Sequence, residues 1–400
     1  MLITKEKLAR MLKIASKAVS SKSTLPVLEG VRIFESDGHL TVQATNLENG
    51  ISITTDLTPD DTKAVDYVLP IKTFLPLIDL WNDDLVTIKI DGNAAILKGK
   101  SSKSKILGYE GAEFPPMMSE RIPLVRWILS EGDWERICSL VPYAAATNAD
   151  RPVLNACHFA FRGDKLTVES ADGFRLAKLE LSGIENHTNN VDETVFDLII
   201  PLMFFAKIAP VLPKGEITIT GLKMSGIDND KPTLVSFSVM GVDGEVTAFS
   251  ALIEGTYPSV TSVVPLPDTL KIQFDVPREK FEKSLTRGRI FASENMRVTL
   301  AGNKEKGRLL VISESEELGT SQDIIEIENV TSDFVVTYNN HFIKETASKM
   351  KGDKIHIEFE HSQKPTKVTS PETVDYMVII MPMHIEAMSE SDYAKRAATD

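Results

Sequence analysis

Few residues of this 400-residue chain combine the types and spacing that catalysis needs. Asp172 and Gly173 interrupt a segment of alternating polar and apolar residues, and Arg175 follows them closely. A catalytic carboxylate works beside a nucleophile or a second titratable group, and the sequence supplies neither nearby. Because Asp-Gly is a turn dipeptide, the pattern favours a turn at Asp172 over a catalytic site.

Cys157 and His158 form the other potentially reactive pair. They are adjacent in a strand-like segment, where neighbouring side chains point to opposite faces of a sheet. We therefore expect a structural role for both. The sequence has no glycine-rich phosphate loop, nucleophile elbow or histidine pair with metal-ligand spacing, so we expect no catalytic residue, no metal and no cofactor.

The elements that would position these residues come in three copies. A strand followed by a polar break occurs at residues 37–47 and again at 164–178, and Pro26 and Pro152 keep the same offset. A third strand of this kind lies at 308–313. A constant offset between several landmarks indicates an internal repeat.

Each copy also continues in the same way, because a short apolar strand leads into a helix and another strand follows. These entering strands lie at residues 66–70, 197–201 and 335–339, and a further helix opens each copy near residues 5–19, 134–141 and 278–287. Strands joined without long crossovers favour antiparallel sheets with helices on one side. We therefore predict an α+β fold of three repeated domains, each with two helices packed on antiparallel sheets.

Proline-containing segments mark the ends of the copies, at 112–117 and 255–267. They predict domains at residues 1–122, 123–256 and 257–385. The remaining residues, 386–400, are polar and lack apolar periodicity, so we expect a mobile C-terminal tail.

Composition limits the class of protein. Hydrophobic residues make up 42% and charged residues 25% of the chain, which is ordinary for a globular protein. No apolar run approaches the roughly 20 residues of a membrane span, no secretory signal is visible, and the only cysteines are Cys138 and Cys157. These features predict a cytoplasmic protein that does not enter a membrane.

The net charge of −13 argues against a generally basic nucleic-acid binder, yet two of the opening helices carry exposed cations. The basic residues are Arg10, Lys13 and Lys17 in the first helix, Arg136 in the middle one, and Lys280, Lys283 and Arg287 in the third. In the third helix they follow i, i+3, i+7 spacing and form one stripe. A solvated helix face and a phosphate-binding surface both remain possible from this pattern.

Three short signatures resemble one known family. They are Ser-Ala-Asp-Gly-Phe-Arg-Leu-Ala at 170–177, Tyr-Pro-Ser-Val-Thr-Ser-Val-Val-Pro at 257–265 and Val-Ile-Ile-Met-Pro-Met-His-Ile at 378–385. In this order on a threefold repeat they resemble the bacterial DNA polymerase III beta subunit, the sliding clamp. The family typically has Thr-Asp-Gly-His-Arg-Leu at the first signature, so Ala171 and Phe174 depart from that pattern.

The resemblance implies a head-to-tail homodimer, in which six domains close a ring around duplex DNA without reading its sequence. Such a protein is a processivity factor without catalysis, and its partners are DNA polymerase, the clamp loader and other replication or repair proteins. Lys22 and Lys72 match positions that meet DNA in the family, whereas Met203 occupies the position of Lys72 in the middle copy. The seven helix cations named above are further candidates for DNA binding.

The resemblance also implies one groove between the second and third domains, where short partner peptides bind. Its lining would comprise Leu154, Gly173, Phe174, Arg175, Leu176, Pro258, Val263, Ile379, Met381, Pro382 and Met383. Leucine, valine, proline and methionine offer an adaptable apolar surface for such peptides. From the residues alone, Met381–Met383 could equally be a strand end packed in the core.

Two other classes of function compete with the clamp. Three α+β repeats could hold a hydrolase site at a domain junction, with Asp172 and Arg175 in it, although no nucleophile or metal set is recognisable. The repeats could also form a scaffold that binds proteins and never DNA. A size measurement combined with a DNA topology test separates the three.

Overall fold

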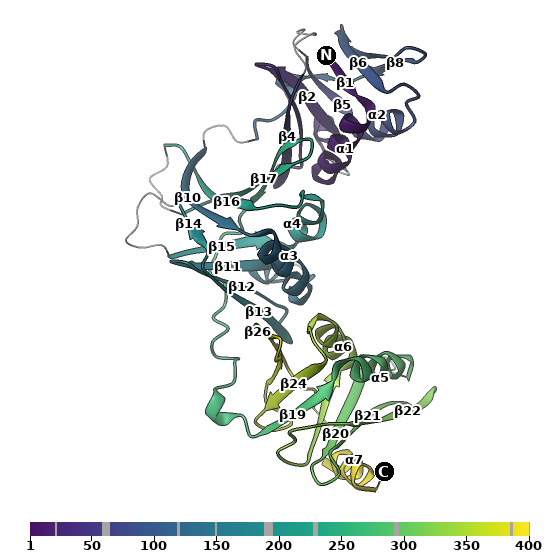
Figure 1. Cartoon of the computed structure of the whole chain (residues 1–400), viewed down its shortest axis with the longest axis vertical. Coiled ribbons are helices and arrows are strands. Elements are labelled where there is room, and N and C mark those ends of the chain that lie inside the picture. The colour runs from purple at the N-terminus through teal and green to yellow at the C-terminus, as the bar shows by residue number, and fades with distance from the viewer. Residues whose placement is uncertain are drawn as a thin grey trace. The chain divides into compact units, whose positions relative to one another are not determined.

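The computed structural model of the protein describes residues 1–20, 22–57, 65–117, 121–148, 150–187, 195–226, 231–291, 296–384 and 387–399. The chain folds as two compact units (Figure 1). The first holds Met1–Cys138, Phe159–Leu166 and Ser182–Gly255, and the second holds Ser139–His158, Thr167–Leu181 and Thr256–Asp400. None of the helices built from the described residues is long and apolar enough to cross a membrane.

Two antiparallel sheets lie wholly in the first unit. Their strands are β1 (Leu2–Thr4), β2 (Gly30–Ser36), β3 (His39–Thr45), β4 (Asn49–Asp56), β5 (Asp66–Pro70), β6 (Leu85–Asp91), β7 (Ala94–Lys98), β8 (Lys103–Leu107), β9 (Tyr109–Glu110), β10 (Arg121–Leu129), β14 (Glu185–Asn186), β16 (Ile217–Met224), β17 (Leu234–Gly241) and β18 (Gly244–Ala251). One sheet has the order β1-β6-β7-β8 and the other the order β14-β10-β16-β17-β18-β4-β3-β2-β5-β9.

The ten-stranded sheet joins the first two sequence repeats. Strand β4 of the first repeat pairs with β18 of the second, in a register that runs from Asn49 opposite Ser250 to Thr54 opposite Glu245. The two repeats are therefore linked by backbone hydrogen bonds as well as by side-chain contacts. We call this ladder the first seam.

The helices of the first unit are α1 (Lys5–Ala15), α2 (Ile71–Asp79) and α4 (Leu202–Lys207), together with most of α3 (Glu131–Leu140). Helix α1 buries Leu8, Met11, Leu12 and Ala15, which recur at the spacing of one helix face. This face packs against α2 and the sheet, so the charged residues of α1 lie on the opposite side.

Strand β15 (Val195–Pro201) also belongs to the first unit, and the residues of β11 (Ala156–Arg162), β12 (Lys165–Ala171) and β13 (Arg175–Ser182) are divided between the two units. The predicted strands are confirmed, and Leu40 and Val42 in β3 and Leu166 and Val168 in β12 are buried as expected. The expected exposure of the alternate positions holds only in part, because Thr41 and Glu169 are buried as well.

The second unit contains eight further strands and three helices. They are β19 (Ile272–Pro277), β20 (Arg297–Asn303), β21 (Arg308–Ser315), β22 (Gly319–Glu326), β23 (Phe334–Asn339), β24 (Lys354–Phe359), β25 (Thr366–Ser370), β26 (Thr373–Ile380), α5 (Arg278–Phe291), α6 (Asn340–Lys349) and α7 (Ala387–Thr399). One sheet runs β22-β21-β20-β23, and in the other β13 is followed by β26-β25-β24-β19. The pairing of β13 with β26 links the second and third repeats, and we call it the second seam.

The three repeats share one strand plan. The orders β19-β24-β25-β26 and β22-β21-β20-β23 in the third repeat mirror β1-β6-β7-β8 and β4-β3-β2-β5 in the first, and β10-β16-β17-β18 follows the same plan in the second. The pairings within the two four-stranded sheets and at both seams are antiparallel, in agreement with the predicted α+β class. At each seam, the counterpart of β4 in one repeat pairs with the counterpart of β8 in the next.

The mobile C-terminal tail predicted for residues 386–400 is wrong over its described part. Residues 387–399 form helix α7, which packs on β20, β21 and β23 in the second unit (Figure 1). Ala397 joins an apolar cluster of sheet residues, and Tyr393 packs against it. Two such contacts are too few to give the segment a visible apolar period, so the polar sequence concealed the helix. Glu386 and Asp400 lie outside the described residues.

Candidate functional site

The second seam ends at the turn that the sequence analysis singled out. Its register runs from Leu179 opposite Tyr376 to Arg175 opposite Ile380, and the Met381 amide then donates to the Phe174 carbonyl at 2.8 Å. Gly173 has φ of +92°, so the predicted turn is confirmed and needs glycine at this point. Asp172 stabilises the turn, because its Oδ1 accepts from the amides of Phe174 and Arg175, both at 2.9 Å.

Arg175 is the most heavily engaged side chain of this region. Its guanidinium donates to Asp172 Oδ2 at 3.0 Å, to Glu345 Oε2 at 2.6 Å and to the Tyr143 carbonyl at 2.7 Å. The side chain is only 7% exposed, and it also lies 4.7 Å from the ring centre of Phe342. Charge-assisted bonds to buried partners fix geometry strongly. Arg175 therefore fastens the turn to α6 and presents little surface to a ligand.

The segment after β26 continues the apolar surface beside this turn. Met381, Pro382 and Met383 are half-buried, and the Met383 amide donates to the Thr337 carbonyl of β23 at 2.7 Å. Phe174 is 61% exposed and stacks on Phe342 of α6 with ring centres 6.2 Å apart. The result is an accessible aromatic and thioether surface carried by three elements of one unit.

The eleven residues implied for the groove divide into two groups by burial. Those with accessible surface are Gly173, Phe174, Pro258, Val263, Met381, Pro382 and Met383. Those that are buried are Leu154, Arg175, Leu176 and Ile379. The buried group can support a binding surface from beneath, but a peptide would meet only the accessible group.

A buried cluster supports the segment that carries Pro258. His158 Nδ1 lies 2.9 Å from Glu169 Oε1, and the ring of Tyr257 stacks on His158 with ring centres 4.7 Å apart. Burial raises the pKa of Tyr257 far above its ordinary value, so its hydroxyl stays protonated at neutral pH. These contacts give His158 the structural role predicted from the sequence, and they hold Tyr257 against the 169–171 segment.

Sequence reasoning missed Phe342, Glu345 and Tyr143 as parts of this surface. Helix α6 buries Ile343, Thr346 and Ala347, so a side chain at 342 falls beside the buried face rather than on it. An aromatic residue outside the apolar stripe of an otherwise amphipathic helix was the one signal available for Phe342. Glu345 and Tyr143 gave no signal, because their contacts with Arg175 join distant parts of the sequence.

The predicted DNA-binding cations of the first unit are exposed or partly exposed, and four of them have carboxylate neighbours. Arg10 donates twice to Asp243, both bonds 2.7 Å long, Lys13 lies 3.0 Å from Asp79, Lys72 lies 3.2 Å from Glu29, and Arg136 lies 3.7 Å from Asp133. Lys17 and Lys22 are exposed. Exposed ion pairs contribute only about 0–1 kcal/mol each, so phosphates can compete with these carboxylates.

Helix α5 carries the predicted stripe of the second unit. Phe281, Ser284, Leu285 and Gly288 face the core, which leaves Lys280, Lys283 and Arg287 exposed as expected from their spacing. Lys283 lies 2.5 Å from Glu279, and Arg287 Nε lies 3.2 Å from Asp323 Oδ2.

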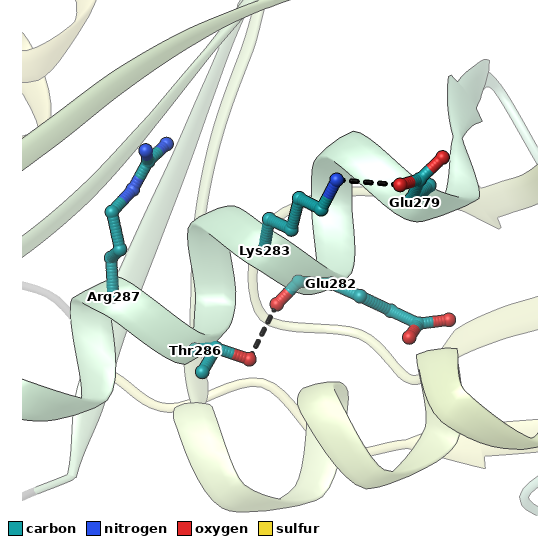
Figure 2. A pocket seen from close by; sticks show the side chains of 5 residues that line it. All are labelled: Glu279, Glu282, Lys283, Thr286 and Arg287. Atoms are coloured by element: carbon teal, nitrogen blue, oxygen red, sulfur yellow. Dashed lines mark hydrogen bonds and ion pairs between the residues drawn. The ribbon is translucent and has the colours of Figure 1, made fainter.

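A shallow surface depression of about 430 Å³ lies along α5, lined by Glu279, Glu282, Lys283, Thr286 and Arg287. In Figure 2, Lys283 points toward Glu279, whereas Glu282 extends to another side of the helix and away from Arg287. The depression mixes both signs of charge and has no apolar lining side chain. It is therefore unlike a pocket for an apolar peptide, and its cations remain available to a phosphate.

Three family profiles match the chain in order. "DNA polymerase III beta subunit, N-terminal domain" matches residues 1–118, the central domain of the same subunit matches 129–259, and its C-terminal domain matches 263–384. Curated relatives include the "Beta sliding clamp" of Streptococcus pneumoniae strain R6, 22% identical over 95% of this chain and 98% of the relative. The "Beta sliding clamp" of Staphylococcus aureus strain Mu50 is 23% identical over 87% of this chain and 89% of the relative.

Solved structures show the same fold at low identity. The DNA polymerase III beta subunit from Thermotoga maritima aligns with a TM-score of 0.81 and 22% identity, covering 96% of this chain and 99% of that chain. The DNA polymerase III subunit beta from Pseudomonas aeruginosa aligns with a TM-score of 0.85 and 18% identity, covering 96% of this chain and 100% of that chain.

Proposed function

Because the chain belongs to the DNA polymerase III beta-subunit family, it is a DNA sliding clamp rather than an enzyme, and we propose that it acts as a closed homodimeric ring. Its partners are DNA and DNA polymerase. The observation that carries this assignment is the match of three clamp domains in order along most of the chain. For those domains we propose the boundaries 1–122, 123–256 and 257–385. We also propose that the protein acts in the cytoplasm, where a clamp loader would place the ring on DNA.

The strand plan supports a head-to-tail dimer. At both seams, the counterpart of β4 in one repeat pairs with the counterpart of β8 in the next. One strand of each kind remains at a sheet edge. These strands are β8 itself in the first repeat and β22, the counterpart of β4, in the third. An unpaired edge is a ready template for another strand. Pairing β22 of one chain with β8 of a second would repeat the seam pattern and close a ring of six domains.

The charges on these two edges are complementary. Strand β8 carries Lys103 and Lys105, whereas β22 carries Glu326 and follows the acidic loop residue Glu317. Each edge also exposes apolar surface, since Leu107 is 61% and Ile324 is 48% exposed. Two β8 edges, or two β22 edges, would repel each other, whereas a β8 edge and a β22 edge would attract each other. The charges therefore favour a heterologous contact, which a ring needs, over a two-fold contact between identical edges.

For the DNA-facing surface we propose the helices of the repeats. Helix α1 has four basic residues against one acidic, and α5 has five against two, in a chain whose net charge is −13. The proposed contacts are Arg10, Lys13, Lys17, Lys22, Lys72, Arg136, Lys280, Lys283 and Arg287. Because several of these cations already have carboxylate neighbours, the contacts would be weak and exchangeable, which suits a ring that slides.

For partner proteins we propose the surface around the second seam. Phe174, Met381 and Met383 supply accessible aromatic and thioether groups, and Arg175 holds the turn beneath them rigid. A pre-organised apolar surface of this kind fits short linear peptides with apolar anchors. The seven accessible groove residues are the proposed contacts, and Leu154, Arg175, Leu176 and Ile379 are the proposed support.

We expect Phe174→Ala combined with Met383→Ala to weaken binding of a fluorescein-labelled peptide copied from the clamp-binding segment of the cognate polymerase about thirtyfold. Losing a central apolar anchor costs about 2 kcal/mol or more. Val374→Ala is the matched control, because Val374 lies at the other end of β26 and is 89% exposed. Fluorescence anisotropy measures the affinity. Equal affinity in the double variant and the control would place the peptide site elsewhere.

Images of the purified protein by negative-stain electron microscopy test the assignment as a whole. We expect closed rings with six lobes at protein concentrations where sedimentation shows a dimer. Open, rod-like monomers at all concentrations would contradict the ring, and would instead favour a scaffold that binds proteins without enclosing DNA.

A further inference from the structure

Helix α7 is attached to the sheet of the third repeat by two side-chain hydrogen bonds to Glu314. Tyr393 Oη donates to one carboxylate oxygen of Glu314 at 2.6 Å, and Arg396 Nη1 donates to the other at 2.7 Å. Burial and the bond to Glu314 raise the pKa of Tyr393 to about 12, so its hydroxyl remains a donor at neutral pH. Lys306 Nζ adds a bond to the Thr399 carbonyl at the helix end, 3.2 Å long.

The sheet face beneath α7 is apolar and is covered by the helix. Alternate residues of β21 point to opposite faces, so Ser313 lies against Gly288 of α5 while Leu310 and Ile312 point to the side of α7. Leu310, Ile312, Ala301 and Val335 are all at most 5% exposed, and Ala397 of α7 belongs to the same cluster. The helix is therefore a packed layer of the domain.

The position of α7 in the chain connects this layer to the candidate groove. Met381 and Met383 are held by backbone bonds to Phe174 and Thr337, and α7 begins at Ala387. Ala387 follows Met383 by four residue steps, which span at most about 14 Å, so the segment 381–383 is confined on one side by β26 and on the other by a packed helix. If the chain ended after Met383, this segment would be a chain terminus and would be more mobile.

We propose that α7 is an anchor that holds Met381–Met383 in the conformation that binds partner peptides. This inference rests on the proposed peptide-binding function of that surface. Binding a peptide to a loose segment costs additional ordering of backbone and methionine side chains, and an anchored segment has already lost that freedom. The anchor thus acts on affinity from the opposite face of the sheet, through the chain itself and not through contact with the peptide.

The experiment compares the full-length chain with Glu314→Ala, with a truncation after residue 386, and with Lys395→Ala as a control on an exposed residue of α7. We expect hydrogen exchange at the Met381 and Met383 amides to accelerate about tenfold in Glu314→Ala and in the truncation, and to stay unchanged in the control. We expect affinity for the labelled polymerase peptide to fall about tenfold in the same two variants, mainly through faster dissociation. Circular dichroism confirms that Glu314→Ala remains folded.

The two readouts separate failure of the anchor from failure of the groove. Unchanged exchange and unchanged peptide affinity in both variants would overturn the anchor and leave the groove intact. Faster exchange with no peptide binding even in the full-length chain would overturn the groove while the anchor stands. Faster exchange with unchanged affinity would show that the mobility of Met381–Met383 does not limit binding, which overturns the anchor's proposed role.

Discussion

A clamp loaded onto nicked circular DNA is expected to stay bound at salt concentrations that abolish its direct binding to a short linear duplex. Direct binding depends on counterion release, and six to ten phosphate contacts would lose roughly 10³- to 10⁵-fold in affinity between about 50 and 200 mM salt. Retention on a closed circle is topological and needs no strong contact. Gel filtration of plasmid loaded by the cognate clamp loader, before and after a single cut, measures the difference.

The same experiment tests the proposed DNA-facing helices. Replacing Arg10, Lys13 and Lys283 with alanine should weaken direct binding and loading but leave retention on the circle nearly unchanged. The matched control replaces three exposed lysines outside the helices, Lys89 and Lys165 in strands and Lys304 in a turn, and should leave all three quantities unchanged. Equal retention on circular and linearised plasmid would contradict encirclement, whatever the alanine variants do.

Reversing the charges of edge strand β8 is expected to weaken the dimer about a hundredfold. Lys103→Glu with Lys105→Glu would place acidic residues opposite the acidic edge of β22, and juxtaposed like charges cost several kcal/mol at an interface. Analytical ultracentrifugation gives the dissociation constant. Lys165→Glu with Lys271→Glu is the control, because it makes the same change in net charge on exposed residues away from either edge.

A compensating variant makes this prediction specific to the proposed pair of edges. Adding Glu317→Lys and Glu326→Lys to the β8 variant restores opposite charges across the interface, and we expect it to recover most of the lost affinity. If the β8 variant and the control dimerise equally well, the ring closes through another surface. Loss without recovery would mean that β8 takes part but does not face β22.

Local elements and their repetition could be predicted from the sequence because each depends on nearby residues. The alternation of Leu166 and Val168 marks a strand with a buried apolar face, although Glu169 on the other face is buried too, and Gly173 marks the turn because it can adopt positive φ. The stripe of Lys280, Lys283 and Arg287 is exposed because helical spacing puts Phe281 and Leu285 on the opposite face. The binding of DNA by these cations and of partner peptides by the groove residues stays a prediction.

The side-chain contacts that hold the candidate site together could not be predicted from the sequence, because they join residues far apart in the chain. Arg175 reaches Glu345, and Arg10 pairs with Asp243, which lies more than two hundred residues further along the chain. Helix α7 is stabilised mainly by its contacts with Glu314 and the sheet, and a polar segment shows no sign of them. Its alanine content was the one local hint of a helix.

The two seams have a mechanical consequence for the proposed ring, which would have to open to admit DNA. Each seam is a run of backbone hydrogen bonds that continues a sheet from one repeat into the next, at β4 with β18 and at β13 with β26. Pulling successive repeats apart within one chain therefore means unzipping a β-ladder that is also braced by side chains, such as Arg10 against Asp243 and Arg175 against Glu345. Each seam thus resists separation of the two repeats that it joins, so in the proposed ring the contact between the two chains would be the easier place to open.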